Sequence, residues 1–156
     1  MELLNSEFEY QKTKAKKLYE RYQEIFCPYL NEYVLLNSKG FDHIRMKRWN
    51  APRGHNEQLV RFRLLYFVPE ILRKSSTLQG FRRERVSERI KIQGEWKTKT
   101  TNVYFYEFIA VIRGYRIRII IKKVAAGQQP YFWSVIPYWK NGPINRKIYT
   151  GNPEED

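Results

Sequence analysis

The sequence predicts an α+β fold in which N-terminal helices pack on a four-stranded antiparallel β-sheet. Two observations lead to this prediction. Apolar residues recur at helical spacing in the first half of the chain, and from about residue 85 the apolar period changes from 3.6 to 2. Neither an internal repeat nor an interdomain linker is visible, so the 156 residues are expected to form a single domain, 1–156.

The helical half is predicted to contain an N-terminal helix, a short apolar segment and a buried helix. Residues 6–26 are amphipathic at helical spacing, and Pro28 ends the pattern. Residues 33–40 are apolar and then rich in turn formers. The segment EQLVRFRLLYF is apolar enough for a buried helix, and Pro69 either kinks it or begins a further short helix.

The second half is predicted to form four strands joined by short turns. Arg113-Gly114 and the segment AAGQQP are the turn signals between the last three of them. Strands that follow one another with short connections form an antiparallel meander. The expected strands are residues 86–96, 102–112, 115–123 and 131–137.

The positive charge of the chain is confined to its middle. The formal net charge is +13, and residues 40–150 hold 23 Lys and Arg against seven Asp and Glu, whereas residues 1–39 are balanced and the final GNPEED is acidic. Such a field attracts polyanions, and nucleic acid is the commonest of them. An acidic protein or a membrane surface remains an alternative partner.

Other composition features narrow the protein class. The single cysteine, Cys27, excludes an internal disulfide and a cysteine-based zinc cluster. The N-terminus lacks a basic segment before an apolar run, and the apolar stretches are shorter than the roughly 20 residues of a membrane span. We therefore expect a cytoplasmic protein without a membrane partner.

No motif for a metal or a cofactor is present: HExxH, CxxC, GxGxxG and the P-loop are all missing. Any catalysis on phosphate is therefore expected to need neither metal nor cofactor. Metal-free cleavage of RNA requires a base for the 2′-hydroxyl, an acid for the leaving oxygen and cations for the phosphorane. DNA lacks the 2′-hydroxyl, so this route would select RNA.

The stretch GFDHIRMKRW supplies the first candidates. We leave open whether it is a helix or a strand, because a spacing of four places His43 and Lys47 on one face in both geometries. A nearby cation would lower the pKa of His43 and favour the neutral base at pH 7. His43 as a helix cap or a core histidine is the alternative. The other histidine, His55, lies in a loop and is a weaker candidate for a second proton carrier.

Basic and hydroxyl residues further along the chain complete the set. On the strand YRIRIIIKK, Ile117, Ile119 and Ile121 alternate with basic residues, so one face is predicted to be core and the other basic. Arg61 and Arg63 diverge on a helix, and Arg61 is the one expected to reach the cleft between helix and sheet. The candidate catalytic residues are His43, Arg61, Lys122 and Ser134, and the candidate RNA-binding residues are Arg45, Lys47, Arg48, Arg63, Arg116 and Arg118.

The segments LLNSKGFDHIRMKRW, LLYFVPEILRKSSTLQG, RIRIIIKK and YFWSVIP, in this order, resemble the barnase–EndoU–colicin–RelE superfamily of metal-independent ribonucleases. The likeness is to its phage-associated branch and makes residues 33–150 a nuclease-like core. It matches His43, Arg61, Lys122 and Ser134 to residues of the family pattern. It implies a toxin-like or effector-like enzyme that cleaves RNA, such as tRNA or mRNA, and is restrained by a cognate antitoxin or immunity protein.

The sequence therefore predicts a metal-independent endoribonuclease that leaves a 2′,3′-cyclic phosphate. Two other classes remain open. A non-catalytic nucleic-acid-binding protein of phage or mobile-element origin would need the basic block but not His43. An interaction protein would dock its basic face on an acidic partner.

Overall fold

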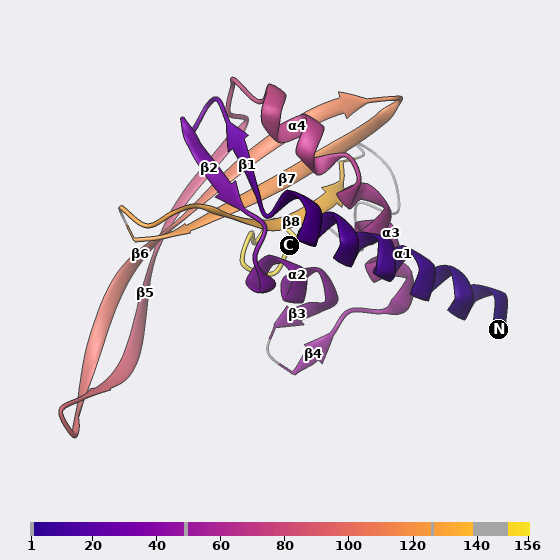
Figure 1. Ribbon diagram of the computed structural model, residues 1–156. Coiled ribbons are helices and arrows are strands. Elements are labelled where there is room, and N and C mark those ends of the chain that lie inside the picture. Colours follow the sequence, from indigo (N-terminus) through magenta and orange to yellow (C-terminus); the bar gives the residue numbers. More distant parts are fainter. Residues whose placement is uncertain (1, 49, 126, 139–149) are drawn as a thin grey trace.

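A six-stranded mixed sheet, with strand order β1-β2-β8-β7-β6-β5, forms the centre of the computed structural model, which describes residues 2–48, 50–125, 127–138 and 150–156 (Figure 1). The α+β class is confirmed, but the predicted four-stranded antiparallel sheet is wrong. A separate two-stranded sheet consists of β3 and β4. The elements are α1 (Glu2–Tyr22), β1 (Glu24–Cys27), β2 (Glu32–Leu35), α2 (Ser38–Arg45), β3 (Met46–Arg48), β4 (Ala51–Pro52), α3 (His55–Leu65), α4 (Val68–Lys74), β5 (Gly80–Ile92), β6 (Glu95–Ile112), β7 (Tyr115–Val124) and β8 (Tyr131–Pro137).

The first difference from the prediction lies at the end of α1. The helix begins at Glu2 and ends at Tyr22, where Gln23 takes a left-handed φ of 48° and the chain turns into β1. Ile25 fits both a helix and a strand. It lies at helical spacing from the apolar residues before it, and it is also a buried position of a strand in which exposed and buried residues alternate. β1 pairs with β2, and β2 runs parallel to β8 through Leu35 and Tyr131. These two strands make the sheet six-stranded and mixed.

The second difference concerns the strand predicted at residues 86–96. Gln93 and Gly94 both have positive φ, 51° and 83°, and form a two-residue hairpin turn within that segment. β5 and β6 pair in register from Gly80 and Glu107 to Ile92 and Glu95. The result is one long hairpin whose outer half extends away from the body of the protein (Figure 1).

β7 and β8 carry the core. Ile117, Ile119 and Ile121 belong to the main apolar cluster beneath the helices, which confirms the predicted core face of this strand. The opposite face is not the open basic surface that was predicted. Ile120 packs there with Val103 and Phe105, and the side chains of Arg118 and Lys122 are buried.

The packing of α2 and α3 on β8 positions the candidate site. Asn37 caps α2 by accepting a hydrogen bond from the amide of Gly40 at 3.3 Å. A Cβ at Gly40 would lie 2.0 Å from the carbonyl oxygen of Phe132, so only glycine allows this close approach. The last turn of α2 and the middle of α3 thereby face the same strand.

Candidate functional site

His43 lies in the last turn of α2 and is almost fully buried. Its ring stacks on the indole of Trp133, with 3.9 Å between centroids and 15° between planes. The Nζ of Lys122 lies 4.0 Å from the centroid of the same indole. Two groups at these distances cannot share one face of the ring, so Trp133 is held between His43 and Lys122.

Arg53 fixes the tautomer of His43. Its Nε donates to the backbone oxygen of His43 at 3.0 Å, and its Nη2 lies 3.1 Å from His43 Nε2. A guanidinium has donors only, so Nε2 accepts and the proton of the neutral ring is on Nδ1. Arg53 Nη1 also donates to Glu57 at 2.8 Å. His43 is thus held as a neutral imidazole of one tautomer.

Burial lowers the pKa of His43 from 6.5 to about 2, and the positive charges of Arg53, Arg61 and Lys122 act in the same direction. A hydrogen bond to the backbone of Asp156 opposes them. The predicted effect of a neighbouring cation therefore has the expected sign, but burial is the larger cause and the cation in contact is Arg53.

Arg61 is completely buried and forms the floor of the site. Its Nη1 donates to Ser134 Oγ and to the backbone oxygen of Asp156, and its Nη2 donates to Glu57 at 3.0 Å. Burial lowers the pKa of Arg61 to about 9, followed in effect by the charge of Arg53. The Nε of Arg61 has no hydrogen-bond partner among the described residues. One buried donor therefore remains free for a further acceptor.

Residues 150–156, here called the acidic segment, cover these cations. Glu154 accepts two hydrogen bonds from Lys122 Nζ at 2.9 and 3.0 Å. Ser134 Oγ donates to the backbone oxygen of Asp156, and the indole N–H of Trp133 donates to the carbonyl of Pro153 at 2.9 Å. Asp156 is completely buried. Every catalytic candidate therefore contacts the acidic segment directly or through a shared partner.

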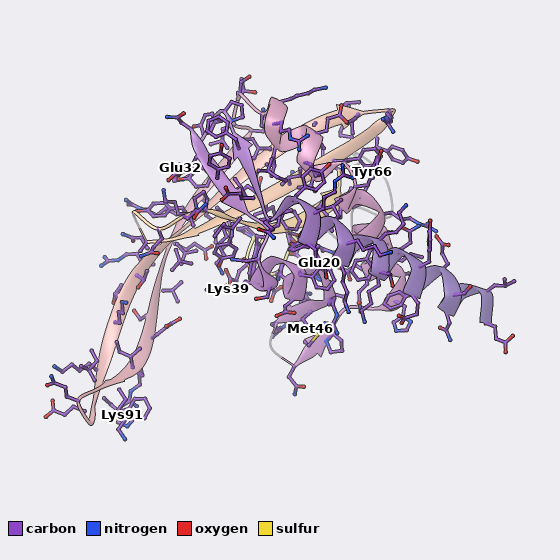
Figure 2. The ribbon with its side chains drawn as sticks, in the orientation of Figure 1. Glu20, Glu32, Lys39, Met46, Tyr66 and Lys91 are labelled. Atoms are coloured by element: carbon purple, nitrogen blue, oxygen red, sulfur yellow. The ribbon has the colours of Figure 1, made fainter. Side chains whose placement is uncertain are left out.

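A pocket of about 890 Å³ opens at the rim of the site, between α2, β3, β8 and the acidic segment. Lys39 and Met46, which are labelled in Figure 2, line it together with His43 and Trp133. Two further cations of this rim approach the carboxylate of Glu155: the Nζ of Lys47 at 3.7 Å and Nη2 of Arg48 at 3.6 Å.

The structure brings the four catalytic candidates together but separates the RNA-binding candidates. Lys47 and Arg48 lie on β3 at the site, and Arg45 is half-buried at the end of α2. His43 and Lys47 line the same pocket, but α2 ends between them at Arg45, so a regular helix or strand spacing does not place them there.

The remaining RNA-binding candidates lie elsewhere. Arg63 is exposed and pairs with Glu7 of α1 at 2.9 Å. It lines a different pocket, of about 590 Å³, between α1 and α3. Arg116 is exposed on β7, and Arg118 is buried near Glu107 and over the ring of Tyr138. His55 stacks on Phe8 of α1 with centroids 4.5 Å apart.

Sequence reasoning missed Arg53, Glu57, Trp133 and the acidic segment. A signal for the first two was present, because Arg53, Glu57 and Arg61 are spaced by four residues and form two ion pairs along one line of α3 and its N-terminal approach. Trp133 lies next to Ser134 at an irregularity in the pairing of β7 with β8 and carried no signal of its own. In the sequence, GNPEED shows only its negative charge and gives no sign of where it packs.

In the described ranges, no group of three or more His, Cys, Asp or Glu side chains is arranged to hold a metal ion. The site offers cations, a hydroxyl and an imidazole, which are groups that bind and transform anions. Comparison with protein-family models, curated proteins and solved structures finds no match to this chain. None of the helices described is both long and apolar enough to cross a lipid bilayer.

Proposed function

We propose that this protein is a metal-independent endoribonuclease that cleaves RNA by attack of a 2′-hydroxyl on the adjacent phosphodiester. The observation that carries the proposal is the buried Arg61, which directs its donors to Ser134 and to an oxygen of the acidic segment beside His43. A guanidinium, a hydroxyl and a neutral imidazole around one oxygen are the groups that a phosphorane requires. The resemblance of the sequence to the barnase–EndoU–colicin–RelE superfamily implies the same reaction.

In the proposed reaction, a phosphate replaces the backbone oxygen of Asp156. Arg61 and Ser134 hold a non-bridging oxygen, and Lys122 stabilises the charge that develops on phosphorus. His43 carries the proton from the 2′-hydroxyl or to the leaving 5′-oxygen, and water carries the other proton. The P–O2′ bond forms as the P–O5′ bond breaks, which leaves a 2′,3′-cyclic phosphate and a 5′-hydroxyl.

In the closed site, burial lowers the pKa of His43 and Arg53 covers its Nε2, so His43 would be a poor proton carrier there. Displacement of the acidic segment by RNA would admit water and bring a phosphate charge next to the ring. Displacement would also remove the hydrogen bond to Asp156 that raises the pKa of His43, and the phosphate would take over that role. Water and the phosphate charge would then raise the pKa toward neutrality, where a general acid or base is effective. The enzyme would therefore acquire its proton carrier only when substrate is bound.

The surroundings of the site support single-stranded regions of RNA, such as those of tRNA or mRNA, as substrate. Lys47 and Arg48, with Arg45 behind them, are placed at the rim where phosphates adjacent to the cleaved one would lie. An acidic antitoxin or immunity protein would bind the same cations and restrain the enzyme. A cytoplasmic location follows from such a substrate and such a partner.

The test uses total RNA and purified protein in excess EDTA, with end-group analysis of the fragments. We expect wild type and His55→Ala to produce cyclic-phosphate ends and His43→Ala to produce none, since only His43 belongs to the site. RNA binding should be retained in all three proteins. Cleavage that persists in His43→Ala would contradict the assignment.

A second function has one observation in its favour. The locked, neutral state of His43 suits a protein that binds nucleic acid without transforming it, in which the ring is a stacking partner for Trp133. Under this alternative, all three proteins of the same assay bind RNA equally and none of them cleaves it.

A further inference from the structure

We propose that the acidic segment occupies the place of an RNA backbone, marks three anion subsites and closes the site until RNA displaces it. The anion-binding geometry stands on its own, but the identity of the anion as an RNA phosphate rests on the proposed function. Three successive residues, Glu154 to Asp156, each present an oxygen to a different group of cations.

The innermost subsite holds the backbone oxygen of Asp156. Arg61 and Ser134 donate to this oxygen, and Arg53 Nη2 donates at 2.7 Å to the backbone oxygen of the preceding residue, Glu155. These are hydrogen bonds from charged or hydroxyl groups in a buried space, which is the environment in which they are strongest. The free Nε of Arg61 gives this subsite one more donor than the segment uses. A phosphate, which has several acceptor oxygens, would use it.

The second subsite is the ammonium of Lys122, which the carboxylate of Glu154 engages with both oxygens. The ammonium also lies over the rings of Trp133 and Phe105, at 4.0 and 5.5 Å from their centroids. Its position is therefore fixed by the protein even without Glu154. An anion that replaces the Glu154 carboxylate would find the charge already in place.

The third subsite is at the rim, where the carboxylate of Glu155 faces Lys47 and Arg48. These ion pairs are longer than 3.5 Å and partly exposed, so each contributes little and is weakened by salt. This is the end of the segment from which an incoming polyanion would begin to displace it.

The segment is itself pre-folded for the role. The carboxylate of Asp156 accepts hydrogen bonds from the amides of Thr150 and Gly151 and from the hydroxyl of Thr150. The Asp156 carboxylate therefore stabilises the conformation of the segment, and the backbone oxygen of Asp156 occupies the inner subsite. A segment tethered in this way competes with RNA at a high effective concentration. The apparent affinity for RNA is then the affinity of the open protein multiplied by the fraction of protein that is open.

The test is a binding measurement on the full chain with a non-cleavable probe, a fluorescein-labelled pool of random 2′-O-methyl RNA 12-mers. Glu154→Gln/Glu155→Gln keeps the length and shape of the segment but removes two anions from the subsites. Glu9→Gln/Glu20→Gln changes the net charge equally at exposed positions of α1 and is the matched control. We expect about a tenfold gain in affinity for the first variant and less than a twofold gain for the control.

A peptide of sequence TGNPEED, added in trans, should compete with the probe on the first variant. Equal gains in the two variants would overturn the proposal, because the segment would then act only through net charge. Tighter probe binding without cleavage of unmodified RNA would remove the nuclease and keep the anion subsites. If unmodified RNA is cleaved but the first variant binds the probe no more tightly than wild type, the nuclease stands and the role of the acidic segment is overturned.

The geometry points to a second RNA contact on the outer part of the β5-β6 hairpin, here called the arm (residues 82–101), and this inference does not depend on the first. Residues that pair across the two strands share a face, so the register divides the arm into two surfaces. One surface carries cations without any carboxylate: Arg83, Arg85, Arg89 and Lys91. The other is balanced, since Arg82, Lys97 and Lys99 share it with Glu84, Glu88 and Glu95.

Aromatic rings accompany the cations on the acid-free surface. Trp96 is 62% exposed near the turn, with Arg89 and Lys91 at 5.7 and 6.0 Å from the centroid of its indole. Tyr104 continues the same face toward the body. Figure 2 shows Lys91 at the far end of the arm, away from the helices. A row of cations with an aromatic ring at each end, on an exposed ribbon, suits the phosphates and bases of single-stranded RNA.

Two triple variants of the full chain test the arm against the same 12-mer pool. Arg83→Ala/Arg85→Ala/Arg89→Ala removes three cations from the acid-free surface, and Arg82→Ala/Lys97→Ala/Lys99→Ala removes three from the other. We expect the first to lose about tenfold in affinity at 0.15 M salt and to lower the salt slope by about 2, with less than a threefold loss in the second. Equal losses in the two variants would overturn this contact, as would unchanged affinity in the first variant.

Discussion

The rings of His43 and Trp133 stack 3.9 Å apart, and this contact joins α2 to β8 at the point where Lys122, Arg53 and the acidic segment converge. The indole contacts His43 on one side and Lys122 on the other, and it donates to the carbonyl of Pro153 at 2.9 Å. One side chain therefore sets the spacing between the proton carrier and a cation of the proposed site, and its N–H reports whether the segment is bound.

The stability of the protein should depend on pH through His43. Its pKa is about 2 in the folded protein and about 6.5 when unfolded, so the unfolded chain binds the proton first as the pH falls. Stability is therefore unaffected above about pH 6.5 and declines below it. Between pH 7 and pH 5 we expect the free energy of unfolding to fall by about 2 kcal/mol, and not in His43→Gln. Urea unfolding at both pH values measures the difference, and equal slopes in the two proteins would refute it.

Arg53 should control the titration of His43. The chain has two histidines, so the His43 ring signals can be assigned by NMR with His55→Asn. Wild-type His43 should not titrate between pH 5 and pH 8. Arg53→Gln removes both the adjacent charge and the bond to Nε2, and should raise the pKa of His43. Arg45→Gln, in the same turn of α2 as His43, is the control and should leave the His43 ring signals unchanged.

Arg61 should be irreplaceable by lysine. A lysine keeps the charge but cannot bond Ser134, Glu57 and the segment at once, because its ammonium lacks the planar fork. We expect Arg61→Lys to reduce RNA cleavage about 100-fold and to cost about 2–4 kcal/mol of stability. The exposed Arg63 provides the comparison, and Arg63→Lys should stay within about 0.5 kcal/mol and twofold of wild type. Equal behaviour of the two lysine variants would contradict the role of Arg61.

Gly40 should be required for the placement of His43. An added Cβ would lie 2.0 Å from the Phe132 carbonyl and push α2 away from β8. Gly40→Ala should lower the free energy of unfolding by more than about 2 kcal/mol and weaken the near-UV circular dichroism of the stacked Trp133. Gly54→Ala, whose Cβ meets nothing within 4 Å, should cost no more than about 1 kcal/mol.

The sequence predicted the buried residues of the site better than the sheet that carries them. Arg61 was predicted to turn inward and Arg63 outward, and the structure confirms both orientations. That prediction succeeded because residues two apart on a helix must diverge. The sheet prediction failed where local pattern is ambiguous, since Glu24–Cys27 extends a helical pattern and the parallel contact of Leu35 with Tyr131 has no local signal.

Long-range partners explain the rest of the difference. The Gln93-Gly94 turn lies within an alternating stretch, and the alternation of the residues gives no local sign that the chain reverses there and that Lys91 comes to share a face with Trp96. Arg53 and the acidic segment reach the site only because α3 and β8 meet, and their hydrogen bonds join residues up to 102 positions apart. No pattern within a window of the sequence contains such pairs.

The most direct measurement of the central claim compares two substrates with the Glu154→Gln/Glu155→Gln protein in EDTA. One is a random pool of RNA 12-mers, and the other is the same pool with every 2′-hydroxyl methylated. Mass spectrometry should find 2′,3′-cyclic phosphates from the RNA pool and intact 12-mers from the methylated pool, at similar affinity for both. Tight binding of both pools with neither cleaved, or cleavage of both, would contradict a ribonuclease that uses the 2′-hydroxyl.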